Sequence, residues 1–219
     1  MANKAKLCVL ISGRGTNLQA LIEAASAPDY PAEIALVISN KPQAEGLKRA
    51  TAAGIHQTVL DHNDFKTRED FDAALDEELR MRQIDFVCLA GFMRILTGQF
   101  VRDWRGRIIN IHPSLLPGFR GLHAHERMID AGVKIAGCTV HFVSPELDAG
   151  PIIGQAALTV SPDDTPQSLA ARILELEHKL YPACVKLIVQ NKARLSGATV
   201  TYDRSIVAGG ALMNPPESA

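Results

Sequence analysis

Short, unbroken apolar segments recur along the first half of the chain, and each is followed by a segment with helical periodicity. A strand with one face in water alternates apolar and polar residues, whereas a continuous apolar run is typical of a strand buried on both faces. Strands of this kind occur in parallel sheets that helices cover on both sides. The sequence therefore predicts an α/β fold with a doubly wound, mostly parallel sheet and helices on both faces. The predicted strands are 6–12, 33–39, 57–60, 85–91 and 107–112, and the predicted helices between them are 18–26, 44–54, 67–83 and 97–104.

After residue 120 the pattern changes. A long helical segment there contains Pro182, which predicts a kink. The terminal MNPPESA is expected to be frayed. No repeat or low-complexity linker interrupts the 219 residues, which favours a single domain. The predicted elements of this half are a helix at 124–132, strands at 135–143 and 150–160 joined by the loop SPELDA, a helix at about 165–190 and a weak strand in ATVTYD.

Composition and charge exclude several classes of protein. The chain has 23 basic and 24 acidic residues, and a formal net charge of −1 is unlike that of proteins that bind nucleic acid or membrane surfaces. Its four cysteines stand singly in apolar runs, which predicts buried thiols in a reducing cytoplasm. The first apolar run, Leu7 to Ile11, is too short for a signal sequence or a membrane span. We therefore expect a cytoplasmic protein that binds any anionic partner at a local site.

A glycine-containing loop, SGRGTNLQ at 12–19, joins the first predicted strand to the first helix. Glycines let the backbone approach a ligand, and the N–H groups at a helix N-terminus favour an anion. Leu18 stands where a dinucleotide fingerprint has its third glycine, and no acidic residue ends the second strand to hold a ribose. The loop lacks the G-K-[ST] of a Walker A motif. It therefore predicts a monophosphate site assisted by the side chains of Thr16 and Asn17, unless it is a plain tight turn.

The sequence RIINIHPSLLPG contains an amide and an imidazole two residues apart at the end of an apolar run. In a strand, Asn110 and His112 project from the same face, and Pro113 ends the strand. Both side chains are therefore expected at the carboxyl edge of the sheet, where open α/β sheets bind ligands. An amide donor and a protonated imidazole could stabilise an oxyanion and supply a proton. Asp148 is a candidate partner for the imidazole. The alternative is a structural histidine beside a turn-forming aspartate.

Six blocks of sequence together resemble the folate-dependent formyltransferase family, and within it the phosphoribosylglycinamide formyltransferases. The N-x-H-P-S-L-L-P and D-x-G-P motifs mark users of formyltetrahydrofolate, and the S-G-x-G-[ST]-N loop and the short length are similar to the enzymes that act on glycinamide ribonucleotide. The blocks run in order from about residue 6 to 190: LISGRGTNLQALI, ISNK, LAGFMRIL, NIHPSLLPGFRGLHAH, GCTVHFVSPELDAGPII and EHKLYP.

The resemblance implies a formyltransferase-like, Rossmann-like fold and a role in purine biosynthesis. The implied reaction moves a formyl group from the co-substrate 10-formyltetrahydrofolate to the amine of glycinamide ribonucleotide, which gives formylglycinamide ribonucleotide and tetrahydrofolate. A single formyltransferase domain over 1–219 is expected. It would comprise a nucleotide-phosphate half (about 1–105), a folate and catalytic half (about 106–192) and a short C-terminal tail. A monomer or a homodimer is expected.

The implied site for glycinamide ribonucleotide combines the glycine loop with a helix residue. The backbone around Gly15, Thr16 and Asn17 would hold the phosphate, and Glu177 would hold the ribose hydroxyls. Thr16 stands where serine is common in the family, and this replacement keeps the hydroxyl. Without the resemblance, Glu177 would be interpreted as one more solvated charge on a helix.

The implied folate site includes the segment GFMRIL, which would accept the pterin largely through backbone hydrogen bonds and apolar contacts. The loop 144–150 is similar to the folate-binding loop that closes beside the pterin. Without the resemblance, GFMRIL would be a strand end entering a loop, and Arg68 an exposed helix residue. The implied folate-binding residues are Arg68, Met93, Arg94, Ile95, Leu96 and Asn110.

The implied catalytic residues are Asn110, His112 and Asp148. The amine would attack the formyl carbon, Asn110 and protonated His112 would stabilise the oxyanion, and His112 would act as the general acid toward the departing folate nitrogen. Asp148 would tune His112 by holding the imidazole in its charged form. The resemblance implies no metal and no covalent intermediate. His123 and His125 form an H-x-H pair without an accompanying ligand cluster, and His141 could support the catalytic face.

Three alternatives remain open. Hydrolysis of 10-formyltetrahydrofolate is expected to need an additional N-terminal domain, whereas the first strand here starts at residue 6. Formylation of initiator methionyl-tRNA is expected to need a C-terminal domain and a basic surface. A non-catalytic nucleotide-binding module would have no use for Asn110, His112 and Asp148 together.

Overall fold

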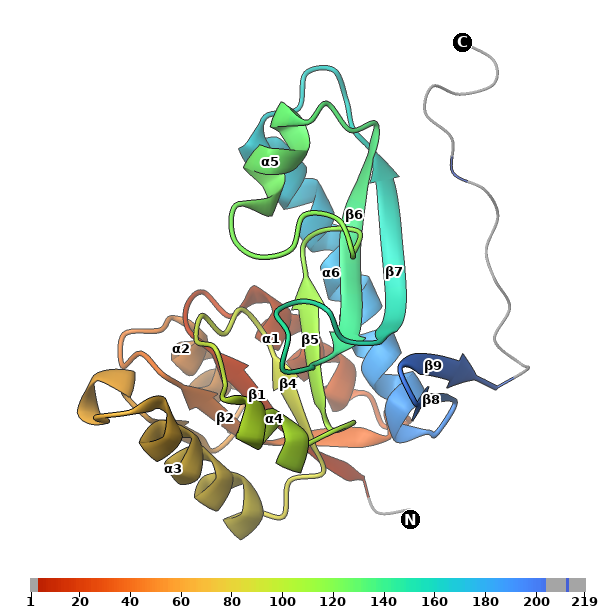
Figure 1. Cartoon of the computed structure of the whole chain (residues 1–219). Coiled ribbons are helices and arrows are strands. Elements are labelled where there is room, and N and C mark those ends of the chain that lie inside the picture. The colour runs from red at the N-terminus through yellow and green to blue at the C-terminus, as the bar shows by residue number, and fades with distance from the viewer. Residues whose placement is uncertain (1–3, 204–211, 213–219) are drawn as a thin grey trace. The chain divides into compact units, whose positions relative to one another are not determined.

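The computed structural model of the chain describes residues 4–203 and 212 (Figure 1). Contacts between Cα atoms group the chain into two compact units. The first comprises Met1–Asn110 with Phe142–Pro145, and the second comprises Ile111–His141 with Glu146–Ala219. The single domain expected over 1–219 stays a prediction. The frayed end expected for MNPPESA lies outside the described residues.

Seven strands are hydrogen-bonded in the order β3-β2-β1-β4-β5-β6-β7. The strand pairs from β3 through β5 are parallel, and β6 pairs with β7 in antiparallel register. Since β1 lies inside this order, with β2 and β3 on one side and β4 on the other, the chain winds in both directions from it. The predicted α/β class with a mostly parallel, doubly wound sheet is confirmed. The strands are β1 Ala5–Ile11, β2 Ala32–Ser39, β3 Gln57–Val59, β4 Phe86–Leu89, β5 Ile108–His112, β6 Ile135–Phe142 and β7 Ile152–Thr159.

The helices of the first unit pack against both faces of its strands. Alternate residues of β1 point to opposite faces. Cys8 and Leu10 enter a core with Phe71 and Leu75 of helix α3, Arg68–Met81, and with Trp104 directly after helix α4, Gly98–Asp103. Figure 1 shows α3 and α4 in front of these strands and α1 behind them. The helices are α1 Thr16–Ser26, α2 Gly46–Ala52, α3 Arg68–Met81 and α4 Gly98–Asp103, with a 3₁₀ turn at His62–Asp64.

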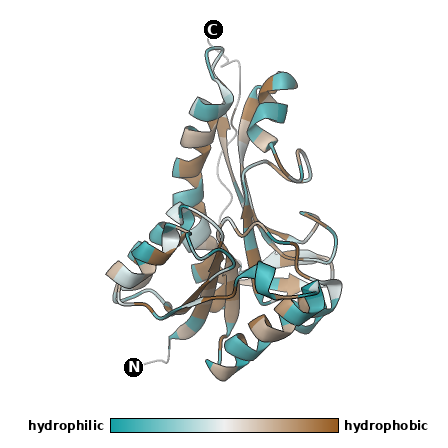
Figure 2. Ribbon diagram, turned by 90° about the vertical axis from the view of Figure 1, so that its left-hand side faces the viewer, coloured by the Kyte–Doolittle hydropathy of each residue, from teal (hydrophilic) through white to brown (hydrophobic). Residues whose placement is uncertain are grey.

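Threonine side chains cap the helices that the sequence predicted most clearly. The Asp70 N–H donates to Thr67 Oγ1 at 3.0 Å, so α3 begins at the expected cap. At the start of the long helix α6, Pro166–Val189, Thr165 and Ser168 accept hydrogen bonds from each other's backbone N–H groups in a capping box. Pro182 lies inside α6. Figure 2 shows that the helices carry both hydrophilic and hydrophobic residues, as helices with one buried face do.

The second unit is built around β6, β7 and α6. Apolar residues of α5, Ala124–Asp130, and of α6 form its core together with β6. Gly137 of β6 lies so close to β7 that a Cβ atom there would stand 2.0 Å from the carbonyl oxygen of Ala156. A two-stranded hairpin follows α6, formed by β8 Ala193–Ser196 and β9 Thr199–Tyr202. The weak strand signal of ATVTYD is thus β9, whereas β8 was not predicted.

All four cysteines are buried and free of disulfides. Burial raises the pKa of Cys8, and it raises the pKa values of Cys138 and Cys184 to about 12. Within the described part of the chain, no helix is both long and apolar enough to cross a bilayer.

Candidate active site

His112, the last residue of β5, contacts an oxygen atom through each of its ring nitrogens. Its Nε2 lies 3.0 Å from the carbonyl oxygen of Phe119, and its Nδ1 lies 3.4 Å from Oδ2 of Asp148. A carbonyl can only accept, so Nε2 carries a hydrogen and donates it. Both side chains are buried, which limits the screening of their charges by water. A doubly protonated ring satisfies both contacts, and this is the form that a general acid needs.

Asp148 is fixed by backbone and side-chain contacts. Its Oδ2 accepts a hydrogen bond from the Gly121 N–H at 2.8 Å, and its Oδ1 lies 3.8 Å from Nε2 of the buried His141. The backbone of Asp148 has φ of 48°, a left-handed conformation that aspartate tolerates better than most residues. The carboxylate thus stands between two imidazoles. The structure places His112, Asp148 and His141 together, as the sequence suggested, and their chemical roles stay predictions.

The loop that follows His112 is held against β6, within the second unit, by a fully buried hydroxyl. Thr139 Oγ1 of β6 donates to the Ser114 carbonyl at 2.7 Å and accepts from the Leu116 N–H at 3.0 Å. Ser114 Oγ in turn donates to the Gly118 carbonyl at 2.7 Å. These bonds hold the backbone that presents the Phe119 carbonyl to His112. Sequence reasoning missed Thr139, although a polar residue inside a continuous apolar strand is a signal that it has a buried partner.

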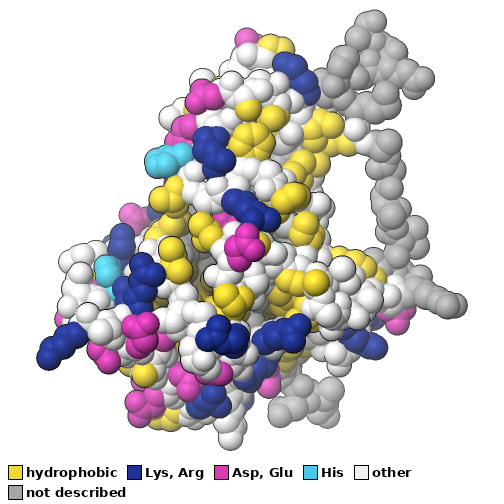
Figure 3. All heavy atoms as spheres, in the orientation of Figure 1, with side chains coloured by type: hydrophobic (Ala, Val, Ile, Leu, Met, Phe, Trp, Pro, Cys, Tyr) yellow, Lys and Arg dark blue, Asp and Glu magenta, His cyan; other side chains and the backbone are white. Residues whose placement is uncertain are grey.

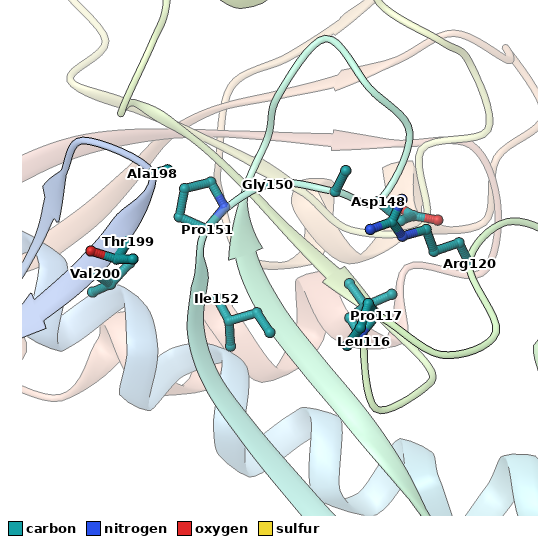
Figure 4. Close-up of a pocket in the computed structure, with 11 residues that line it drawn as sticks. Leu116, Pro117, Arg120, Asp148, Gly150, Pro151, Ile152, Ala198, Thr199 and Val200 are labelled. Atoms are coloured by element: carbon teal, nitrogen blue, oxygen red, sulfur yellow. The ribbon is translucent and has the colours of Figure 1, made fainter.

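A pocket of about 440 Å³ opens beside Asp148 (Figure 4). Arg120 and Asp148 lie on one side of it, and the tip of the β8–β9 hairpin lies on the other. Leu116, Pro117 and the segment 149–152 complete its lining. The pocket is therefore mainly apolar, with a cation and a carboxylate at one end.

The glycine loop of the first unit makes a close crossing with α2. Gly15 has φ of 69°, and a Cβ atom on it would stand 2.6 Å from the Cα of Gly46. The Gly46 N–H donates to the Gly13 carbonyl at 3.0 Å. Helix α1 begins at Thr16, directly after this turn, so its first N–H groups face the loop. The charged residues that line a hollow of about 200 Å³ beside the loop are Arg14, Lys41 and Glu45. The N–H groups at the start of α1, with two cations against one carboxylate, suit a small anion.

The other predicted site residues divide between the two units. Arg68 is exposed at the start of α3, and Met93, Arg94, Ile95 and Leu96 follow β4. Asn110 is half-buried in β5, on the same face of the strand as His112. Glu177 is only 6% exposed in α6, so the alternative interpretation as a solvated helix charge is wrong. Because a glutamate is seldom buried this deeply, Glu177 is a candidate for a specific role.

The H-x-H pair makes no obvious metal centre. His123 is exposed and lies 3.7 Å from Glu126, and burial lowers the pKa of His125. Within residues 4–203 and 212, no group of three or more His, Cys, Asp or Glu side chains is arranged to hold a metal ion. On the face shown in Figure 3, basic and acidic side chains are interspersed.

Comparison with known proteins places this arrangement in a family. The formyl transferase family model matches residues 5–185, and the chain therefore belongs to that family. The phosphoribosylglycinamide formyltransferase of Haemophilus influenzae is 44% identical over 190 residues, which cover 87% of this chain and 90% of that protein. The crystal structure of glycinamide ribonucleotide transformylase 1 from Symbiobacterium toebii superposes with a TM-score of 0.89 at 44% identity, covering 92% of this chain and 95% of that one.

Longer relatives contain the same region. The trifunctional purine biosynthetic protein adenosine-3 of Gallus gallus is 50% identical over 196 residues, which cover 90% of this chain. This chain spans only 20% of the length of that protein.

Proposed function

We propose that this chain transfers the formyl group of 10-formyltetrahydrofolate to the amine of glycinamide ribonucleotide, giving formylglycinamide ribonucleotide and tetrahydrofolate in de novo purine biosynthesis. The buried pair of His112 and Asp148 carries the proposal. N10 of the folate is a poor leaving group unless it receives a proton, and an imidazolium held by a carboxylate can supply that proton. The similarity to phosphoribosylglycinamide formyltransferase over most of both chains supports the choice of substrates.

The acceptor is proposed to bind through its phosphate and its ribose. The turn at Gly15, with Thr16 and Asn17 opening α1, offers backbone N–H groups to the phosphate. Glu177, buried in α6, is proposed to accept hydrogen bonds from the ribose hydroxyls. The folate is proposed to contact Arg68, Asn110 and the four residues 93–96.

The chemistry begins when the amine nitrogen attacks the formyl carbon. A carbon–nitrogen bond forms, and the carbonyl electron pair moves onto oxygen, where the Asn110 amide and the His112 imidazolium are proposed to stabilise it. The bond from carbon to N10 of the folate then breaks, and N10 receives a proton from His112. The amine loses a proton, which restores the imidazolium, so protons balance over the cycle.

The Nε2–H of His112 is the proton proposed to be passed to the folate. It now points at the Phe119 carbonyl, while Nδ1 faces Asp148. Transfer therefore requires Nε2 to exchange this carbonyl for the substrate or a bridging water, with Asp148 retaining its hold on Nδ1. No step needs a metal or a covalent enzyme intermediate.

One assay separates the candidate activities. The chain is supplied with 10-formyltetrahydrofolate in the presence and absence of glycinamide ribonucleotide, and the release of tetrahydrofolate is followed. Release only with the acceptor is expected. Release without it would instead indicate hydrolysis, and no release in either case would contradict an enzymatic role.

Asp148→Asn is expected to lower kcat by about 10- to 100-fold, because the amide keeps the shape of the carboxylate but removes the charge that faces His112. The KM for glycinamide ribonucleotide should change much less. Steady-state kinetics measure both values. Asp163→Asn, at an exposed position of the same unit, serves as the matched control. An Asp148→Asn variant with the kcat of the control would contradict the role assigned to the charge.

We further propose that the chain works in the cytoplasm as a monomer or a homodimer, with small molecules rather than nucleic acid or membrane as its partners. The four buried cysteines form no disulfide, which supports a reducing compartment. Cell fractionation and light scattering would test the two parts of this proposal.

A further inference from the structure

The connection between β4 and α4, residues 91–97, is irregular in conformation, but buried side chains hold its backbone. Within it, Met93 and Ile95 are 65% and 54% exposed, whereas Leu96 is 8% exposed. Large apolar side chains held out in water are candidates for contact with a ligand. Their placement depends on what fixes the backbone behind them.

Ser12 holds the first end of this segment. The Met93 N–H donates to Ser12 Oγ at 2.7 Å, and the Ser12 hydroxyl donates its hydrogen to Oδ1 of Asn40 at 2.5 Å. Ser12 is 7% exposed and Asn40 is 1% exposed. Because the single hydroxyl hydrogen is directed at Asn40, a lone pair of Ser12 is oriented toward Met93. The hydroxyl is thus preorganised as an acceptor.

Asp72 of α3 holds the second end. Its Oδ2 accepts a hydrogen bond from the Thr97 N–H at 2.7 Å, and Thr97 Oγ1 in turn caps α4 by accepting from the Phe100 N–H at 3.2 Å. Asp72 is 4% exposed, and burial raises the pKa of its carboxyl, although hydrogen bonds from Thr97 and the charge of Arg94 act in the opposite direction. Burying a carboxylate lowers the free energy of unfolding. The position of Asp72 is therefore better explained by a functional role than by stability alone.

We propose that Ser12 and Asp72 are positioning residues that fix the two ends of segment 93–97, and through it the folate co-substrate. The inference rests on the proposed function, because it assumes that this segment meets the folate. It assigns roles to two side chains that lie behind the segment and far from it in sequence, with Ser12 and Met93 separated by 81 positions. Neither side chain needs to touch the ligand.

Kinetics with both substrates test the proposal. Ser12→Ala and Asp72→Ala each leave a backbone N–H without its acceptor, and each is expected to raise the KM for 10-formyltetrahydrofolate about tenfold. In Asp72→Ala, whose site lies outside the glycine loop, the KM for glycinamide ribonucleotide should stay within about twofold. Ser12→Thr and Asp72→Asn keep an acceptor and should restore most of the folate KM. Ser26→Ala and Asp70→Ala, at exposed positions of α1 and α3, are the matched controls.

A second measurement does not depend on turnover. Amide hydrogen exchange of residues 91–97 should accelerate at Met93 in Ser12→Ala and at Thr97 in Asp72→Ala, and it should remain slow in the controls. An unchanged folate KM with unchanged exchange would overturn the proposal, as would an equal rise in the KM values of both substrates in Asp72→Ala. If the unsubstituted chain has no turnover, the proposed function fails. In that case, unchanged exchange at Met93 in Ser12→Ala would also show that Ser12 does not fix segment 93–97. Faster exchange would support the fixing of the segment, although its link to the folate would have failed.

Discussion

His112→Ala is expected to lower kcat by about 10²–10⁴-fold while the chain still binds glycinamide ribonucleotide. Nδ1 of His112 lies 3.4 Å from Oδ2 of Asp148, and its Nε2–H is the proton proposed to be transferred. Without it, N10 of the folate must leave as an anion or wait for a proton from water. The acceptor is proposed to be held by residues of α1 and α6 instead, so its affinity should change little. Single-turnover kinetics and calorimetric titration with glycinamide ribonucleotide measure the two effects separately.

His56→Ala provides the matched control for this experiment. His56 is exposed in the first unit, where its ring contacts Arg82 at 2.6 Å. The control should have the kcat and the thermal stability of the unsubstituted chain. If His112→Ala retains kcat within about tenfold of that value, another group supplies the proton and the role assigned to His112 is wrong.

Gly15→Ala should cost both stability and affinity for the acceptor. The residue needs a left-handed backbone, and its Cβ atom would stand 2.6 Å from the Cα of Gly46. The left-handed conformation costs a non-glycine residue about 1–2 kcal/mol, and the forced separation of the two backbones adds about 1–3 kcal/mol. The loop that is proposed to bind the phosphate must move to relieve the clash. Denaturant unfolding and the KM for glycinamide ribonucleotide should therefore both change.

A second glycine isolates the effect of the clash. Gly54 has φ of 68°, close to that of Gly15, but a Cβ atom there meets nothing within 4 Å. Gly54→Ala should lose about 1–2 kcal/mol of unfolding free energy through strain alone, with a normal KM for the acceptor. Equal effects of the two substitutions on stability and on KM would mean that the crossing of Gly15 and Gly46 has no special importance.

Local sequence patterns predicted much of the fold. Unbroken apolar runs identified the buried parallel strands, and the expected cap Thr67 lies at the start of α3. The predicted helix 44–54 is shorter in the structure, Gly46–Ala52, because Ala53 and Gly54 leave helical geometry at its end. Strand β8 has only four residues and lacked a recognisable apolar pattern. Its pairing with β9 decides its conformation, and pairing cannot be read from four residues.

The candidate site was predictable only where spacing alone brings groups together. Asn110 and His112 are two positions apart in a strand, so their side chains lie on one face independently of the rest of the fold. In contrast, the hydrogen bonds of Thr139 to the loop after His112, and of Ser12 to Met93, join residues that the sequence keeps far apart. Periodicity contains no information about such contacts. The burial of Glu177 could not be predicted either. A charged residue on an amphipathic helix is exposed unless a tertiary contact covers it, and periodicity does not reveal that contact.

The four buried thiols are expected to react slowly with thiol reagents while the chain is folded, and this property can be used to measure opening of the structure. Thiol reagents attack the thiolate, and a pKa of about 12 leaves roughly one thiolate in 10⁵ thiols at pH 7 for Cys138 and Cys184. Cys8 and Cys88 have no exposed surface at all. These side chains lie in β1, β4, β6 and α6, so both compact units contain reporters. The rate at which each cysteine becomes alkylated would therefore record how often the surrounding unit opens to solvent, and mass spectrometry could separate the two units in one sample.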